Sequence, residues 1–231
     1  ETEDPQLMMD LVWWEIVVLI VAGFGAGLVN VMAGGGSILT VPIMMFLGMP
    51  GPVANGTNRI TIVAHNASAI VTYLRHGVPH AKLCVTLTLV AIPPALLGAW
   101  LSTKLNNEQF EGLLAIVMVA VLILMQAPQA KKQSDADNEP KNLRLGHVLM
   151  AIAGFWGGFI QIGMGFVVLP IMHRVIGLSL VDTNILKVFI IFTYTLLAVF
   201  VFAATSEVLW LVGAIAAIGT VSYTHLRAHE T

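Results

Sequence analysis

Long runs of apolar residues without a single charge set the first limit on how this chain can fold. Four such runs cover residues 16–33, 83–101, 148–172 and 188–204. Each is close to or above the roughly 17 to 25 residues that cross the hydrocarbon core of a bilayer as an α-helix. We therefore predict that each run is one transmembrane helix.

Three shorter runs, residues 60–74, 113–125 and 208–221, become long enough to span when their flanking residues are included. Residues 38–49 would extend only about 18 Å as a helix, which predicts a half-length helix. The predicted fold class is all-α, a polytopic membrane helix bundle. Its first expected partner is the lipid bilayer.

The composition excludes several other classes of protein. Hydrophobic residues make up 57% of the chain and charged residues 10%, against roughly 25% charged residues in soluble domains. The net charge of −2 leaves no basic patch that could follow a nucleic acid. Cys84 stands alone, which excludes a disulfide framework and a cysteine metal site. We expect no metal and no cofactor.

Two parts of the chain resemble each other. The segment GFGAGLVNVMAGGGSILTVPI, residues 23–43, is similar to GFWGGFIQIGMGFVVLPI, residues 154–171. The alignment continues to the Thr-Asn pairs at 57–58 and 183–184. Internal repeats of this kind are typical of transporters. We predict two pseudo-symmetric repeats that contain broken or half-length helices.

The repeats define the predicted domains. Residues 11–126 form the first transmembrane repeat, residues 127–146 a polar cytoplasmic linker, and residues 147–221 the second repeat. Residues 222–231, SYTHLRAHET, resemble translated sequencing-adaptor sequence and are expected to be a non-native tail. The second repeat is therefore expected to be incomplete. Because the chain begins with Glu1 and not with Met, we also expect that a natural start is missing.

The positions of lysine and arginine predict the orientation. Basic residues flank one loop at Arg75 and Lys82 and recur in the linker, whereas the N-terminal segment is acidic. Basic loops face the cytoplasm. Five segments precede the linker, so the two repeats would start on opposite sides of the membrane and be inverted. If the segment at 38–49 returns to its own side, this parity changes, and that alternative stays open.

The GGGS motif at residues 34–37 has two possible roles. A phosphate-binding loop is excluded because no GK[ST] follows the glycines. If the motif breaks one helix and starts another, backbone N–H groups of Gly35, Gly36 and Ser37 would point into a cavity and attract an anion. The alternative is close packing of helices through small residues. A second broken motif, residues 163–165, favours the anion site.

Two cations follow the repeated Thr-Asn pairs, Arg59 in the first repeat and Lys187 in the second. A charge that faces lipid near the bilayer centre costs roughly 2.5 to 3.5 kcal/mol, so both should face a cavity or else reach the headgroups. The adjacent Thr and Asn side chains could orient a substrate or simply cap helices. The predicted substrate-binding residues are Gly34, Gly35, Gly36, Ser37, Asn58, Arg59, Gly163, Gly165, Asn184 and Lys187.

These motifs together resemble a known family. The pattern GGGSILTVPIMMFLGMPGPVANGTNR, its weaker second copy and KVFIIFTYTLLAVFVF are similar to the TauE/SafE sulfite and organosulfonate exporters over most of residues 16–221. The resemblance implies a multi-pass protein of the bacterial cytoplasmic (inner) membrane. It implies a small inorganic or organic anion as substrate, such as sulfite or sulfoacetate. We expect export by alternating access and no catalytic residue.

Two other functions are alternatives. An intramembrane serine hydrolase would use Ser37 as nucleophile and His65 as base. However, GGGS lacks the glycine that follows the serine of a nucleophile elbow. The other is a membrane scaffold without transport, in which both cations could be removed without loss of any transport phenotype.

Overall fold

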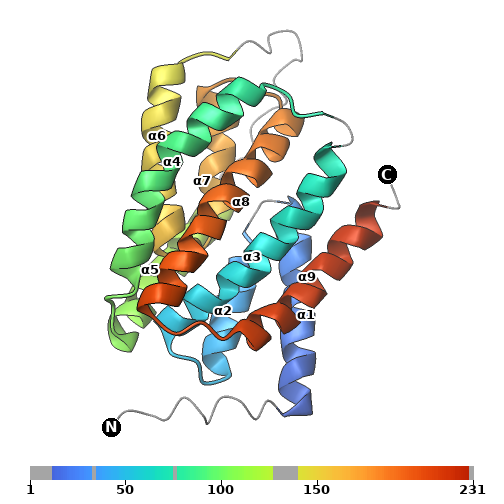
Figure 1. Cartoon of the computed structure of the whole chain (residues 1–231), viewed down its shortest axis with the longest axis vertical. Helices are drawn as coiled ribbons and strands as arrows, with labels where there is room; N and C mark the ends of the chain where they lie inside the picture. The colour runs from blue at the N-terminus through green and yellow to red at the C-terminus, as the bar shows by residue number, and fades with distance from the viewer. Residues whose placement is uncertain (1–11, 33–34, 75–76, 127–139, 229–231) are drawn as a thin grey trace.

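The computed structural model describes residues 12–32, 35–74, 77–126 and 140–228, and its regular structure in these ranges is entirely helical (Figure 1). This confirms the all-α fold class. The helices are α1 (Trp13–Met32), α2 (Ser37–Phe46), α3 (Gly51–Leu74), α4 (Ala81–Ser102), α5 (Asn107–Gln126), α6 (Leu143–Phe159), α7 (Met164–Pro170), a π-helical turn η2 (Ile171–Val175), α8 (Leu180–Thr205) and α9 (Trp210–Ala228).

Three of the described helices are long and apolar enough to cross a membrane: Trp13–Asn30 within α1, all of α4, and all of α8. Large apolar side chains also point outward, including Val85, Leu89 and Leu97 of α4. Such a surface suits lipid rather than water. The helix lengths and this surface support the prediction of a membrane helix bundle.

One predicted span is wrong. The apolar run at 148–172 is not a single helix, because α6 ends at Phe159 and α7 begins at Met164. Between them the backbone enters the left-handed region at Gln161, with φ of 58°, and at Gly163, with φ of 70°. An α-helix cannot continue through residues in this conformation. The break lies at the second glycine motif, in the predicted second repeat, where apolar composition alone gives no signal.

The helices alternate in direction along the chain (Figure 1). α1 begins at the lower end of the view, and the short α2 returns toward that end, where α3 begins. α3 and α5 run upward and α4 runs downward. α6 begins at the upper end, so the corresponding helices of the second part run in the opposite direction to those of the first part.

Glycine contacts hold two pairs of helices at close range. α1 packs along α9, and α4 packs along α6. At each contact a Cβ atom on the glycine would collide with a backbone carbonyl of the facing helix, so only glycine permits this approach. The contacts are Gly23 with Ala216, Gly27 with Thr220, Gly154 with Ala91, and Gly158 with Ala95.

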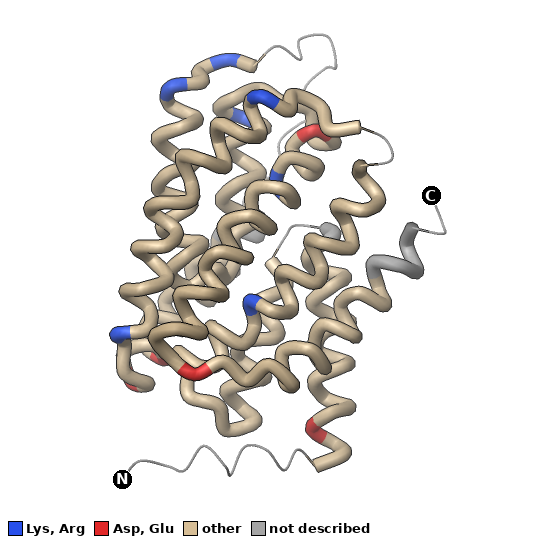
Figure 2. Tube along the Cα trace, viewed as in Figure 1, with Lys and Arg blue, Asp and Glu red and all other residues tan. Residues whose placement is uncertain are grey.

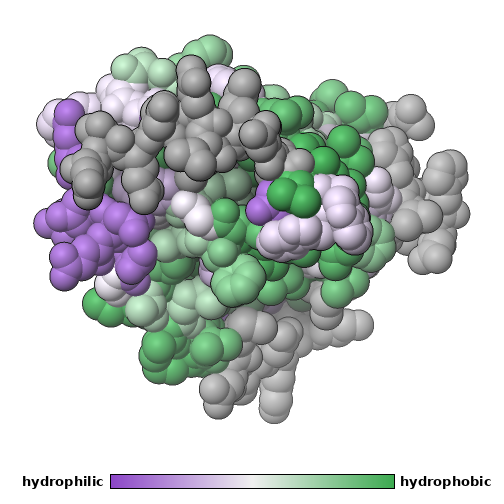
Figure 3. Space-filling model, turned by 90° about the horizontal axis from the view of Figure 1, so that it is seen from below, coloured by the Kyte–Doolittle hydropathy of each residue, from purple (hydrophilic) through white to green (hydrophobic). Residues whose placement is uncertain are grey.

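Charged residues gather at the two ends of the bundle (Figure 2). In the described ranges, the upper end is mainly basic and the lower end mainly acidic, with one exception at each end. The upper group consists of Lys82, Lys141, Arg144, Arg174 and Asp182, and the lower group of Glu15, Lys104, Glu108, Glu111 and Glu207. Seen from below, a hydrophilic patch lies over the loop between α4 and α5, among largely hydrophobic residues (Figure 3).

Some of the predicted boundaries fall on residues that the structure does not describe. The basic residues Arg75, Lys131 and Lys132 and most of the predicted linker, 127–139, lie outside the described ranges. The predicted tail begins at residue 222, yet α9 continues through it to Ala228. The ring of Tyr223 lies edge-on against that of Phe24, with centroids 5.3 Å apart.

Candidate functional site

A small polar cavity of about 30 Å³ lies where the two helix breaks meet α1, α3 and α8. Its apolar walls include Ile62, Met164 and Ile191. A cavity of this volume has space for about two water molecules. The polar side chains that line it are Asn30, Ser37, His65, Asn66, Gln161 and Lys187.

Lys187 is the charged residue of this cavity. It is the eighth residue of α8, roughly 10 Å along the helix from its start, and its side chain is only 4% exposed. Its Nζ donates a hydrogen bond to Asn184 Oδ1 at 2.8 Å. No carboxylate among the described residues pairs with it. Lys187 therefore presents a positive charge whose remaining N–H groups are available to a ligand in the cavity.

Arg59 has a different environment. Its side chain is fully buried, at 0% exposure, and does not line the cavity. One guanidinium nitrogen donates to Gly157 O at 3.2 Å, and the other donates to Gly158 O. These carbonyls belong to the last turn of α6, where helical carbonyls lack partners within the helix. Arg59 therefore caps the C-terminus of α6 and neutralises the negative end of its dipole.

The Arg59 guanidinium makes two further contacts. It donates to Gln161 Oε1 at 2.7 Å, and its Cζ lies 4.5 Å from the centroid of the Phe202 ring in α8. No carboxylate of the described chain pairs with this cation either. All of its partners are neutral, so its charge is distributed over carbonyl dipoles and an aromatic face.

Gln161 connects the cavity to Arg59. It lies in the break after α6, is buried, and lines the cavity. Its Oε1 accepts from Arg59, while its Nε2 donates to Thr195 Oγ1 of α8 at 2.7 Å. Both ends of its amide are therefore engaged. Because Arg59 does not reach the cavity, Gln161 stands between that cation and the cavity.

The first glycine motif is partly occupied by the protein itself. Gly36 N–H donates to Asn30 Oδ1 at 2.7 Å, so this predicted anion donor is already bonded. Gly35 packs against the ring of Phe166 in α7. Ser37 begins α2 and lines the cavity. Gly34 lies outside the described residues.

The second glycine motif builds the break rather than the wall of the cavity. Gly163 precedes α7 with φ of 70° and lies against Val121 of α5. Gly165 is buried in the first turn of α7. Neither glycine lines the cavity, whereas Met164 between them does.

The two asparagines predicted to orient a substrate have different partners. Asn58 is buried and accepts a hydrogen bond from the Thr40 hydroxyl of α2. Asn184 accepts from Lys187 and donates to Leu180 O at 3.0 Å. Asn58 thus holds α2 on α3, and Asn184 orients the lysine. Neither asparagine lines the cavity.

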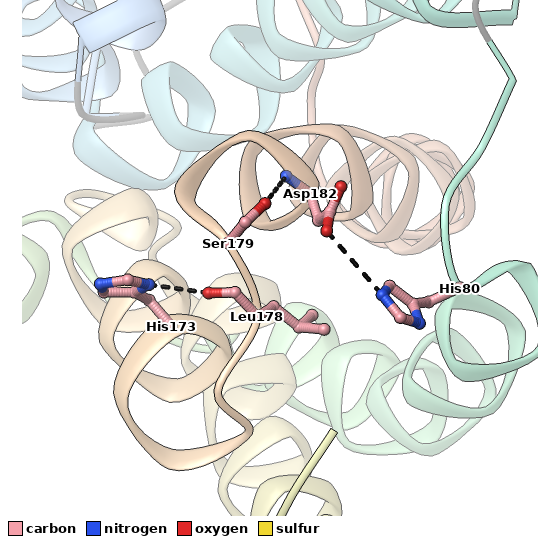
Figure 4. Close-up of polar contacts among 5 residues, drawn as sticks. All are labelled: His80, His173, Leu178, Ser179 and Asp182. Atoms are coloured by element: carbon pink, nitrogen blue, oxygen red, sulfur yellow. Dashed lines mark hydrogen bonds and ion pairs between the residues drawn. The ribbon is translucent and has the colours of Figure 1, made fainter. Parts of the chain in front are cut away.

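The residues around Arg59 and Lys187 are not helix caps, with one exception. α3 begins at Gly51, so Asn55 and Thr57 lie inside the helix. At the start of α8, Ser179 Oγ accepts from Asp182 N–H at 3.0 Å and is the cap (Figure 4). Asp182 pairs instead with His80, at 3.8 Å, which joins the start of α4 to the start of α8.

A histidine fixes the loop beside this cap. His173 Nδ1 lies 2.7 Å from Leu178 O in Figure 4 and is buried. The pair holds η2 against the loop that leads into α8. Neither His173 nor the His80–Asp182 pair lines the cavity, so this end of α8 is a structural joint.

Comparison with known proteins gives the family. The sequence profile described as Sulfite exporter TauE/SafE matches residues 19–227. The chain belongs to the TauE/SafE sulfite exporter family. It is therefore a member of a membrane transporter family, as the sequence motifs predict. No solved structure matches the chain significantly.

Curated relatives of this TauE/SafE chain carry the same general description. This chain is 26% identical over 212 residues to a probable membrane transporter protein, ORF9, of Sinorhizobium. The alignment covers 92% of this chain and 81% of that protein. This chain is 23% identical to a probable membrane transporter protein of Haemophilus influenzae, covering 92% and 84%. The protein YunE of Bacillus subtilis, also a probable membrane transporter, is 28% identical, covering 68% and 66%.

The hydrolase alternative is not favoured by these results. Ser37 and His65 do line the same cavity, but none of the residues that line it is a carboxylate that could orient a catalytic histidine. The TauE/SafE family is one of transporters. The structure brings together Ser37 and Lys187 from the predicted site and places Arg59, Asn58 and Gly163 outside the cavity.

The sequence analysis missed Asn30 and Gln161 as cavity residues. Both positions carry a signal that the repeat alignment contains. Asn30 lies seven residues after Gly23, and Gln161 lies seven residues after Gly154, so the two amides occupy matching positions. A polar residue retained at the same place in both copies of an apolar segment is expected to face the interior.

Proposed function

We propose that this TauE/SafE chain transports a small anion, sulfite or an organosulfonate such as sulfoacetate, across the bacterial cytoplasmic membrane by alternating access. The observation that carries the proposal is Lys187, a buried ammonium that faces the cavity and has no carboxylate partner among the described residues. A buried cation without a partner is costly. An anionic ligand would supply the missing charge.

The surroundings of Lys187 support a polar ligand. Ser37 offers a hydroxyl at the cavity, Asn66 lines it with an amide whose Nδ2 also donates to Ile62 O at 2.8 Å, and Asn30 holds the start of α2 beside them. The remaining wall is apolar and includes Ile62, Val188 and Ile191. A charge-assisted hydrogen bond in such a site is stronger than one made in water. The substrate would therefore bind at Lys187 and leave Arg59 as a fixed part of the scaffold.

Alternating access rests on two inverted repeats, which the packing supports. Gly23 and Gly154 occupy matching positions of the two copies, and each lies against the backbone of a helix from the other part of the chain. The helices that contain the two similar segments, α1 and α2 against α6 and α7, also run in opposite directions (Figure 1). Inverted repeats of this kind let a cavity open to either side in turn. The basic end of the bundle would face the cytoplasm.

The size of the cavity supports a conformational cycle. A volume of about 30 Å³ holds about two water molecules and is too small for a sulfonate group with its carbon chain. The short helices α2 and α7 border the cavity through Ser37 and Met164. Movement of these elements away from α3 and α8 would enlarge it for loading.

The experiment is tracer sulfite flux into proteoliposomes that contain the full chain, compared with the Lys187→Gln variant. We expect flux above that of empty vesicles, reduced at least tenfold by Lys187→Gln. Lys104→Gln is the matched control. Lys104 lies exposed at the lower end of the bundle, so this substitution should leave flux unchanged. Equal flux in wild type and Lys187→Gln would remove Lys187 from the site. A scaffold without transport predicts no flux in any of the three.

A further inference from the structure

We infer that the cavity is matched to one negative charge, so that the protein selects singly charged anions over doubly charged anions of similar size. This inference rests on the proposed function and narrows its substrate class. Sulfite would be carried in its singly protonated form. Among organosulfonates, those without a second acidic group would be preferred, and sulfoacetate, whose carboxylate adds a second negative charge, would be a weaker substrate than a sulfonate with one charge.

The first step is the number of positive charges at the cavity. Among the described residues, Lys187 and Arg59 are the buried lysine and arginine side chains. Only Lys187 lines the cavity. One ammonium balances a monoanion and leaves a dianion with a net negative charge in an apolar enclosure. Such an unbalanced charge is unfavourable there.

The second step is the position of Arg59. Its guanidinium is held by Gly157 O and Gly158 O, which do not line the cavity, and by Oε1 of Gln161, which does. Gln161 also donates to Thr195, so its side chain is fixed at both ends. The positive charge of Arg59 is therefore separated from the cavity, and from a ligand in it, by the side chain of Gln161. Gln161 is the specificity-determining residue in this arrangement.

The third step concerns the other titratable group at the cavity. His65 of α3 lines the same cavity as Lys187 and would add a second charge if it were protonated. The helices that pack around it contribute no other charged side chain to the lining. At about pH 8 a histidine of ordinary acidity is neutral. The selectivity for monoanions should therefore be measured at that pH.

The experiment is competition against tracer sulfite uptake in proteoliposomes at about pH 8 with two matched pairs of anions. Isethionate and sulfoacetate differ in a hydroxymethyl group against a carboxylate, and methanesulfonate and sulfate differ in a methyl group against a charged oxygen. We expect the monoanion of each pair to compete at a concentration at least tenfold lower than its dianion. Equal or stronger competition by the dianions would overturn the inference.

The same experiment separates this inference from the proposed function. If competition depends on Lys187 but the dianions compete better, the proposed transport function stands and the proposed preference for monoanions is rejected. No competition by any of the four anions, or competition unchanged in Lys187→Gln, would remove the proposed site itself.

A variant tests the role of Gln161. Gln161→Ala frees one donor group of Arg59 and opens a path from it to the cavity, so the preference for monoanions should fall at least threefold. A folded Gln161→Ala protein with the wild-type preference would overturn the role of Gln161. If this variant does not fold, the wild-type competition series decides the inference.

Discussion

Arg59 and Lys187 occupy comparable places in the two parts of the chain, yet they differ in what surrounds them. Arg59 has three acceptors from the end of α6 and its break, together with an aromatic face. Among the described residues, Lys187 has one acceptor, Asn184, and otherwise faces a cavity. A buried cation near the middle of a bundle can therefore be a structural cap or a binding group. Its acceptors, and not its depth, distinguish the two.

Arg59→Gln should have the largest effect on stability. The shorter side chain leaves the carbonyls of Gly157 and Gly158 without their charged donor at the end of α6. We expect a loss of about 3 to 5 kcal/mol in the free energy of unfolding. Denaturant unfolding in detergent micelles measures it. An Arg59→Gln protein as stable as wild type would show that Arg59 does not cap α6.

Gln161→Leu should have an intermediate effect. The variant removes the acceptor of one Arg59 donor and the donor to Thr195, while Gly157 and Gly158 still hold the guanidinium. We expect a loss of about 1 to 3 kcal/mol by the same unfolding measurement. A loss as large as that of Arg59→Gln would mean that Gln161, and not the helix end, is the main partner of the cation.

Asp182→Asn should have a small effect. The ion pair between Asp182 and His80 lies at a partly exposed helix end, where such pairs contribute about 0 to 1 kcal/mol. The backbone cap from Ser179 to Asp182 remains in this variant. A shift in unfolding midpoint that equals that of Gln161→Leu would show that the joint between α4 and α8 contributes more than a surface pair.

Lys187→Gln should leave stability within about 1 kcal/mol of wild type, or raise it, because it removes a buried charge that has one protein partner. Flux should be lost in the same variant. This combination is the opposite of the pattern expected for Arg59→Gln. Strong destabilisation by Lys187→Gln would make both cations structural and end the contrast between them.

The sequence predicts the helical fold well because apolar runs of sufficient length have few alternatives in a bilayer. It does not locate the break after Phe159, since that break depends on backbone conformation at Gln161 and Gly163 rather than on hydropathy. For the same reason the uninterrupted run at 148–172 gives a wrong span.

Arg59 and Lys187 have similar sequence surroundings, and only their tertiary contacts distinguish their roles. Both follow a Thr-Asn pair, and nothing near Arg59 in sequence indicates that its partners lie about a hundred positions away, at Gly157 and Gly158. Gln161 and Asn30 are more accessible to prediction, because their matching positions in the two copies can be read from the alignment.

The close glycine contacts between α1 and α9 affect the order in which the helices can pack during synthesis. Thr220 Oγ1 donates to Gly23 O across 197 positions of the chain. α1 leaves the ribosome well before α9, the helix that covers its glycine face. The glycine contacts between α4 and α6 can form much earlier, because these two helices are closer in the chain. Closure of α1 on α9 is therefore a later step of maturation than closure of α4 on α6, and chains stalled before α9 would offer an uncovered glycine face to other membrane helices.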